Sequence, residues 1–189
     1  APPAPLVSAT RTAPEPACDR ACLTQVAQRY MTALVAKDPK KVEWADTVRF
    51  SENSVPLMIG DGLWGSVSAA GKDPLIVADP AAGTVAWIGT VAEHGQVAFY
   101  GMRIRVDGRR IAAVDTVVRR KEGRPPFADP AGFVRDAAFA RRTERNAGLS
   151  RDGMAGLVHG YFNSLERNDG NTLSRFAADC ARVENGTAM

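Results

Sequence analysis

Glu52 is the first residue in this chain of 189 amino acids whose type and setting suit chemistry. It lies in an alternating segment and shares one face of a predicted strand with Val48 and Phe50. If these two side chains point into an interior, the Glu52 carboxylate points there too. Desolvation raises the pKa of a buried carboxyl group, which suits it for general acid–base catalysis near neutral pH. The structural alternative is a strand-end glutamate that bonds to Asn53 or emerges into solvent.

Asp115 is the second candidate acid or base. It interrupts segment 112–118, which otherwise holds apolar residues and Thr, and it shares a face with Val117 and Arg119. A cross-strand ion pair with Arg119 or Arg103 is the structural alternative. Arg103 could itself stabilise a carboxylate or enolate oxygen. It shares a face with Arg105, however, which favours a solvated side of a sheet.

Five further side chains could contact a ligand. Tyr30 lies on the apolar face of a predicted helix, where it is either a hydrogen-bond donor to a pocket or an ordinary core tyrosine. Trp64 and Trp87 suit a flat or aromatic ligand, and core packing explains them equally well. Asn53 follows the candidate Glu52 directly. His94 falls in a predicted tight turn, where a solvent-exposed imidazole is the alternative to a binding role.

Composition and motifs exclude several other classes of function. The 24 Lys and Arg residues nearly balance 21 Asp and Glu residues, and the basic residues of segment 119–145 are interleaved with acidic ones, so we expect no nucleic-acid partner. No apolar run reaches the ~20 residues of a membrane span. Neither histidine lies near Cys18 and Cys22, so we expect no metal site. Phosphate loops and nucleophile elbows are absent from the sequence, and we expect no cofactor.

The first 17 residues contain five prolines and predict a flexible leader that follows a removed export signal. The protein is therefore expected to be exported, either periplasmic or secreted. Export permits disulfides. The sequence has three cysteines, and we expect Cys180 to pair with Cys18 or Cys22, which leaves one cysteine over.

Hydrophobic periodicity predicts an α+β fold. A period of three to four predicts a helix over 19–36, and a second, shorter helix runs through Val42 and Trp44. Alternation then predicts a strand over 47–57, and turn residues separate the strands that follow. Two N-terminal helices covering an antiparallel meander make an α+β domain. The later strands are expected at 75–78, 84–92, 97–106 and 111–120.

We divide the chain into a leader (1–17), a complete domain (18–122), a linker with a helix (123–149) and an incomplete repeat (150–189). The repeat is inferred because Tyr30 aligns with Tyr161, and the same register pairs the leucines and aspartates that follow each tyrosine. With one inserted residue after Glu43, Glu52 aligns with Glu184. Chance similarity between two amphipathic helices is the alternative interpretation.

The second repeat lacks a meander to cover its helix. Its remainder was removed, lies on a separate chain, or is replaced by packing against the first domain. We therefore expect a homo-oligomer, or a second chain that completes the repeat.

A set of short motifs runs through most of the chain: residues 30–34 with Asp38-Pro39, 48–53, 62–64, Asp79-Pro80 with Gly83, Arg103 with Asp115, 161–162, 168–170, 179–180 and 184–186. These motifs resemble the SnoaL-like branch of the nuclear transport factor 2-like superfamily, and within it an uncharacterised exported group. The resemblance implies a cone formed by N-terminal helices on a curved antiparallel sheet around a deep apolar pocket.

The resemblance implies a cofactor-independent lyase, dehydratase or isomerase that acts on a small apolar or aromatic molecule. Glu52 or Asp115 would be the acid or base, and Tyr30 and Arg103 would stabilise a developing oxyanion. The same superfamily includes binding domains, so the alternative is a non-catalytic exported module that binds a ligand or a protein.

Overall fold

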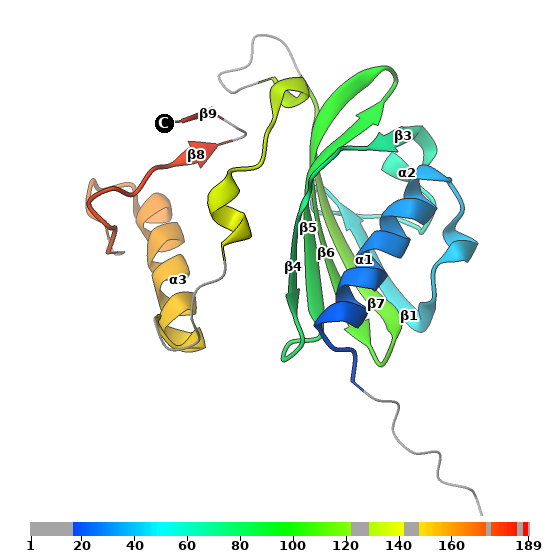
Figure 1. Ribbon diagram of the computed structural model, residues 1–189, viewed down its shortest axis with the longest axis horizontal. Coiled ribbons are helices and arrows are strands. Elements are labelled where there is room, and N and C mark those ends of the chain that lie inside the picture. Colours follow the sequence, from blue (N-terminus) through cyan, green and yellow to red (C-terminus); the bar gives the residue numbers. More distant parts are fainter. Residues whose placement is uncertain (1–16, 122–128, 142–147, 173–174, 185–186, 189) are drawn as a thin grey trace, which may run out of the picture. The chain divides into compact units, whose positions relative to one another are not determined.

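The computed structural model describes residues 17–121, 129–141, 148–172, 175–184 and 187–188. They belong to two units, Ala1–Gly123 and Arg124–Met189. In the first unit a long helix packs against a curved seven-stranded sheet, which confirms the predicted α+β class (Figure 1). None of the described helices is long and apolar enough to cross a membrane.

Helix α1 (Arg20–Val35) begins where the sequence predicts and has one apolar face. The Asp19 carboxylate caps it by accepting a hydrogen bond from the Cys22 N–H at 2.8 Å. Its end is marked by Lys37, whose φ of 55° is left-handed, and by Asp38 before Pro39. Its buried positions recur at helical spacing and face the sheet: Leu23, Val26, Ala27, Tyr30, Met31, Ala33 and Leu34.

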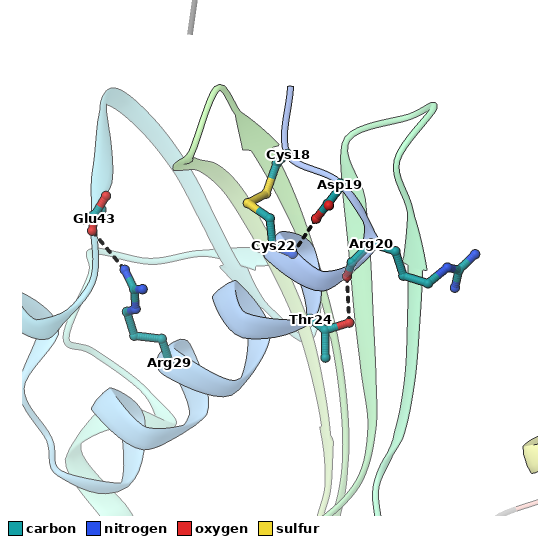
Figure 2. Close-up of a disulfide and its surroundings, with 7 residues drawn as sticks. All are labelled: Cys18, Asp19, Arg20, Cys22, Thr24, Arg29 and Glu43. Carbon is teal, nitrogen blue, oxygen red and sulfur yellow. Dashed lines mark hydrogen bonds and ion pairs between the residues drawn. A yellow bond between two sulfur atoms is a disulfide. The ribbon is translucent and has the colours of Figure 1, made fainter. Parts of the chain in front are cut away.

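The N-terminus of α1 carries a disulfide that differs from the pairing with Cys180 expected from the sequence. Cys18 is bonded to Cys22 (Figure 2). The Cys180 thiol is free and exposed. One cysteine just before a helix and another in its first turn lie side by side, here with Cα atoms 5.3 Å apart. This local geometry explains why no distant partner is needed.

The sheet is a meander with strands added on both sides. Its centre is β5 (Thr84–Glu93), β6 (Gln96–Asp107) and β7 (Arg110–Arg119), which pair antiparallel through tight turns. Strand β1 (Trp44–Glu52) pairs parallel to β7. The remaining strands lie at the two edges: β2 (Val55–Pro56) beside β1, and β3 (Val67–Ala70) and β4 (Leu75–Asp79) along β5.

Two predicted elements differ from the structure in the segment between α1 and the meander. The expected second helix is only a 3₁₀ turn, η1 (Pro39–Lys41), and Trp44 already belongs to β1. The Ile111 N–H donates to the Glu43 carbonyl at 2.8 Å, which draws this segment into the sheet. Strand 47–57 is interrupted at Asn53 and Ser54, since both have positive φ. A short helix, α2 (Leu63–Ser66), follows before β3.

The second unit contains one long helix and short segments. The long helix is α3 (Arg151–Arg167), which lies near the start of the predicted repeat and contains Tyr161. The helix expected near residue 133 is wrong, because two 3₁₀ turns capped by aspartates occur there, η2 (Pro130–Gly132) and η3 (Ala137–Ala140). A small hairpin consists of β8 (Val183–Glu184) and β9 (Thr187–Ala188).

Candidate functional site

The Glu52 side chain ends β1 on the inner face of the sheet, and only 10 % of it is exposed. Its Oε2 accepts a hydrogen bond from the Leu63 N–H at 3.0 Å. Its Oε1 lies 3.9 Å from Arg120 Nη2. A buried carboxylate destabilises the fold unless such partners compensate its charge. The position of the Glu52 carboxylate therefore depends on Leu63, the first residue of α2, and on Arg120, which follows β7.

Tyr30, Trp64 and Tyr100 are buried aromatic residues of the same interior. The rings of Tyr30 and Trp64 meet edge to face, with centroids 5.4 Å apart. Tyr30 Oη and Trp64 Nε1 are both buried, and neither has a hydrogen bond of normal geometry within the described parts of the chain. Buried donors without a hydrogen bond of normal geometry are rare in folded proteins, so this pair needs an explanation.

Burial raises the pKa of the Tyr30 hydroxyl well above its usual value. The neighbouring Trp64 and Tyr100 offset part of this rise, and the charge of Glu52 adds to it. Burial also raises the pKa of Tyr100, with further contributions from Tyr30 and Glu52. Both hydroxyls therefore keep their protons at neutral pH and remain hydrogen-bond donors beside a carboxylate.

Arg120 is partly exposed and forms an ion pair with the buried Glu93. Arg120 Nε lies 2.5 Å from Glu93 Oε1, and Ser66 Oγ donates to Glu93 Oε2 at 2.7 Å. Burial alone would raise the pKa of Glu93, but the hydrogen bonds from Arg120 and Ser66 and the nearby positive charges outweigh it and lower the pKa. Arg120 thus lies between two buried carboxylates, those of Glu52 and Glu93.

A surface pocket of about 290 Å³ opens beside this arginine. We call it the rim pocket. His94 lies in the turn after β5 with a φ of 47° and is exposed there, as its position in a predicted turn suggested. The rim pocket is lined by Glu93, His94, Gln96, Val97, Ala98, Arg120 and Lys121.

Asp115 and Arg103 lie on the opposite, outer face of the sheet. Asp115 Oδ2 is 4.0 Å from Arg103 Nη1 and 3.1 Å from Arg49 Nη2, and Ser51 Oγ donates to Asp115 Oδ1 at 2.8 Å. The register explains this cluster, because Asp115 pairs with Ser51 on β1 and with Arg103 on β6. It borders an open groove of about 680 Å³.

The structure therefore brings Glu52 and Tyr30 together and separates them from Asp115 and Arg103. Trp64 and Trp87 are both fully buried core residues. Asn53 uses its side chain to bind β7: Nδ2 donates to the Val118 carbonyl at 3.1 Å, and Oδ1 accepts from the Val118 N–H at 2.8 Å. Its contacts are structural ones.

Four residues of this interior were not identified from the sequence: Ser66, Glu93, Tyr100 and Arg120. Glu93 is in phase with the buried Trp87 and Val91 of β5, as Tyr100 is with Met102 and Ile104 of β6. The alternation that singled out Glu52 could have found both. Arg120 follows the last residue of β7, and only the paired strands bring it to Glu93 and Glu52.

Among the described residues, no group of three or more His, Cys, Asp and Glu side chains is placed to hold a metal ion. The polar groups of the interior are instead two carboxylates, one guanidinium, and hydroxyl and indole donors. Such a set can move a proton and stabilise an oxyanion.

Comparison with known proteins gives limited matches. A family model described as a domain of unknown function (DUF8021) matches residues 147–189. A search of curated proteins finds no match. An NTF-2 like protein of unknown function from Burkholderia xenovorans LB400 is 9 % identical over 56 % of this chain and 89 % of its own, with a TM-score of 0.44.

Two other solved structures are similar at the same level. A protein from Kribbella flavida DSM 17836, provisionally named a ketosteroid isomerase, is 12 % identical over 56 % of this chain and 84 % of its own, with a TM-score of 0.41. AclR from Streptomyces galilaeus, provisionally named a hydroxylase, is 13 % identical over 55 % of this chain and 82 % of its own, with a TM-score of 0.44. At these values the likeness says nothing about activity. The helix on a curved sheet agrees with the nuclear transport factor 2-like resemblance of the sequence.

Proposed function

We propose that the first unit is a cofactor-independent isomerase, lyase or dehydratase that acts on a small apolar or aromatic carbonyl compound. One observation carries this proposal: a buried carboxylate, Glu52, shares its interior with two buried donors that lack a normal hydrogen bond, Tyr30 Oη and Trp64 Nε1. An isomerase of this type needs a base and donors for an oxyanion, and both are present here.

In the proposed step, the Glu52 carboxylate removes a proton from a carbon next to the substrate carbonyl. The electrons of the broken C–H bond form a C=C bond, and the carbonyl π electrons move to the oxygen. The Tyr30 hydroxyl and the Trp64 indole N–H stabilise this enolate oxygen by hydrogen bonding. In an isomerisation the same proton returns from Glu52 to a different carbon; in a dehydration it leaves with a hydroxyl group as water.

The acid–base role is assigned to Glu52 and not to Asp115 because of their surroundings. Asp115 is half-buried and is bound by Ser51 and two arginines on the outer face. Those partners occupy its carboxylate oxygens. Arg103 lies there as well, so neither residue enters the proposed step.

Substrate access is proposed through the rim pocket. Arg120 lines this pocket and also lies 3.9 Å from Glu52, so a shift of one flexible side chain would connect the pocket to the carboxylate. Its guanidinium would then be available to a polar group of the incoming molecule.

The experiment begins with ligands of defined chemistry. Cyclic unsaturated ketones and hydroxylated aromatic ketones are screened by thermal shift, and each hit is incubated with the protein in D₂O. Proton NMR then detects exchange at the carbon next to the carbonyl, or rearranged product. Exchange or product that depends on Glu52 supports the proposal. Hits that bind and neither exchange nor react favour the alternative of a ligand-binding module.

Export is proposed on separate grounds, the Cys18–Cys22 disulfide. Such bonds persist in oxidising compartments and are rare in the cytosol. Cell fractionation followed by mass analysis with thiol blocking tests it: the exported fraction should carry the oxidised pair. A predominantly reduced cytosolic pool would contradict export.

A further inference from the structure

Helix α3 of the second unit repeats the boundaries of α1. Asp19 caps α1 by accepting a hydrogen bond from the N–H of the residue three positions on. Ser150 caps α3 in the same way, because its Oγ accepts a hydrogen bond from the Gly153 N–H at 3.1 Å. Both helices end at a left-handed residue, Lys37 with φ 55° and Asn168 with φ 47°. These positions fall in the register of the sequence repeat.

The residues after each helix correspond as well. Asp38 Oδ1 accepts from the N–H two residues on at 3.1 Å, and Asp169 Oδ1 does the same at 3.0 Å. In the first unit Tyr30 meets Trp44 edge to face, with centroids 6.2 Å apart at 83°. In the second unit Tyr161 meets Phe176, the aligned residue, at 6.3 Å and 87°. Chance similarity of two helices does not explain a recurring ring pair beyond the helix.

The two helices differ in what covers them. The exposed fractions of Leu23, Met31 and Leu34 on α1 are 0 %, 4 % and 1 %. Their counterparts on α3 are Met154, Phe162 and Leu165, whose exposed fractions are 54 %, 60 % and 48 %. The apolar face has therefore been kept in the second copy, while the sheet that buries it in the first copy is lacking from the described residues of the second unit.

We propose that this face of α3 (Met154, Leu157, Val158, Tyr161, Phe162 and Leu165) binds the concave side of a curved, mainly antiparallel sheet built like that of the first unit. In the first unit α1 packs on β3, β4 and β5. The occupant is identified by this correspondence: an apolar, aromatic-containing concave sheet that enters beside α3 in the orientation that the first sheet has beside α1. The inference is independent of the activity proposed for Glu52.

The test supplies such a sheet from the protein itself. The full chain is extended after Glu184 by a second copy of its own residues 53–121, because Glu184 aligns with Glu52. Hydrogen exchange of amides 151–167 is compared with that in the unextended chain by mass spectrometry. We expect exchange in α3 to slow by at least about 100-fold in the extended chain, as for a helix packed into a core.

Matched variants separate packing from helix propensity. In the extended chain, Phe162→Asp should remove the protection, since the aligned Met31 is buried. Asn163→Asp should leave it unchanged, since the aligned Thr32 is exposed. Val158 and Phe162 are larger than the aligned Ala27 and Met31, so a second extended chain carries Val158→Ala and Phe162→Met to match the core of the first copy.

The proposal is overturned if α3 stays unprotected in both extended chains while α1 keeps its protection. Protection of α3 in the unextended chain that disappears on dilution would also overturn it, because a second copy of the chain would then be the partner of this face.

Discussion

Arg120 Nε lies 2.5 Å from Glu93 Oε1, and the same guanidinium lies 3.9 Å from Glu52 Oε1. One partly exposed side chain therefore compensates two buried carboxylates that come from different strands. The stability of this region therefore depends on this arginine.

Replacing Arg120 by Met should lower the free energy of unfolding by about 3 kcal/mol, because Glu93 would stay buried without its charged partner. Urea denaturation followed by tryptophan fluorescence measures this. Arg103→Met is the matched control: it removes a 60 %-exposed arginine that lies 4.0 Å from Asp115, and it should cost less than about 1 kcal/mol. An equal loss in the free energy of unfolding for the two variants would contradict the stabilising role of the Arg120–Glu93 pair.

Acid should destabilise the protein partly through Glu93. Its pKa is lowered in the folded state from a usual value of 4.5, so below pH 4.5 the unfolded chain binds the proton more readily than the folded one. The stabilisation is complete above that pH and is lost as the pH falls through the lowered pKa. We therefore expect the stability difference between wild type and Glu93→Gln to shrink between pH 5 and about pH 3. A difference that is constant with pH would contradict this assignment.

Gly62 has no side chain and so leaves room for the Glu52 carboxylate to lie close to the backbone. Its φ is +62°, and a Cβ added there would lie 2.9 Å from Glu52 Oε2. Gly62→Ala should cost about 1–3 kcal/mol from backbone strain and displace the carboxylate. Gly65→Ala is the control, because a Cβ there meets nothing within 4 Å and Ala favours the helix. Gly62→Ala should therefore have a lower melting temperature than Gly65→Ala. Equal melting temperatures would argue against the close approach of the Glu52 carboxylate to Gly62.

The Cys18–Cys22 bond should stabilise the start of α1. It closes a short loop, for which the chain-entropy model gives about 2 kcal/mol. Reduction, or Cys22→Ser, should lower the melting temperature, whereas Cys180→Ser should not, since that thiol is exposed and free. A melting temperature that responds to Cys180→Ser alone would refute this pairing.

Much of the fold followed from local patterns in the sequence. Helix α1 and the strands of the meander were predicted from periodicity and turn residues, and the inward orientation of Glu52 followed from its phase with Phe50. These features depend on neighbours in the chain. The same alternation extends to Glu93 and Tyr100, but the strand predicted over 84–92 ended one residue before Glu93, which was assigned to the turn.

Other features depend on which strands pair. The placement of Asp115 between Ser51 and Arg103 requires β7 to lie between β1 and β6, and the parallel pairing of β1 with β7 is not visible in a sequence pattern. The early start of β1 at Trp44 has the same origin, because the neighbouring Glu43 carbonyl bonds to Ile111 of a strand far along the chain. Arg120 could be linked to Glu52 only in three dimensions.

The most direct test of the account compares wild type with Glu52→Gln, which retains an acceptor for the Leu63 N–H and is expected to keep its fold. With a carbonyl ligand found by the thermal-shift screen, deuterium incorporation is followed by proton NMR in both proteins. We predict that exchange at the carbon next to the carbonyl falls by at least about 100-fold in the variant, the usual contribution of a general base. Exchange at an unchanged rate in a folded Glu52→Gln protein would contradict the role of Glu52.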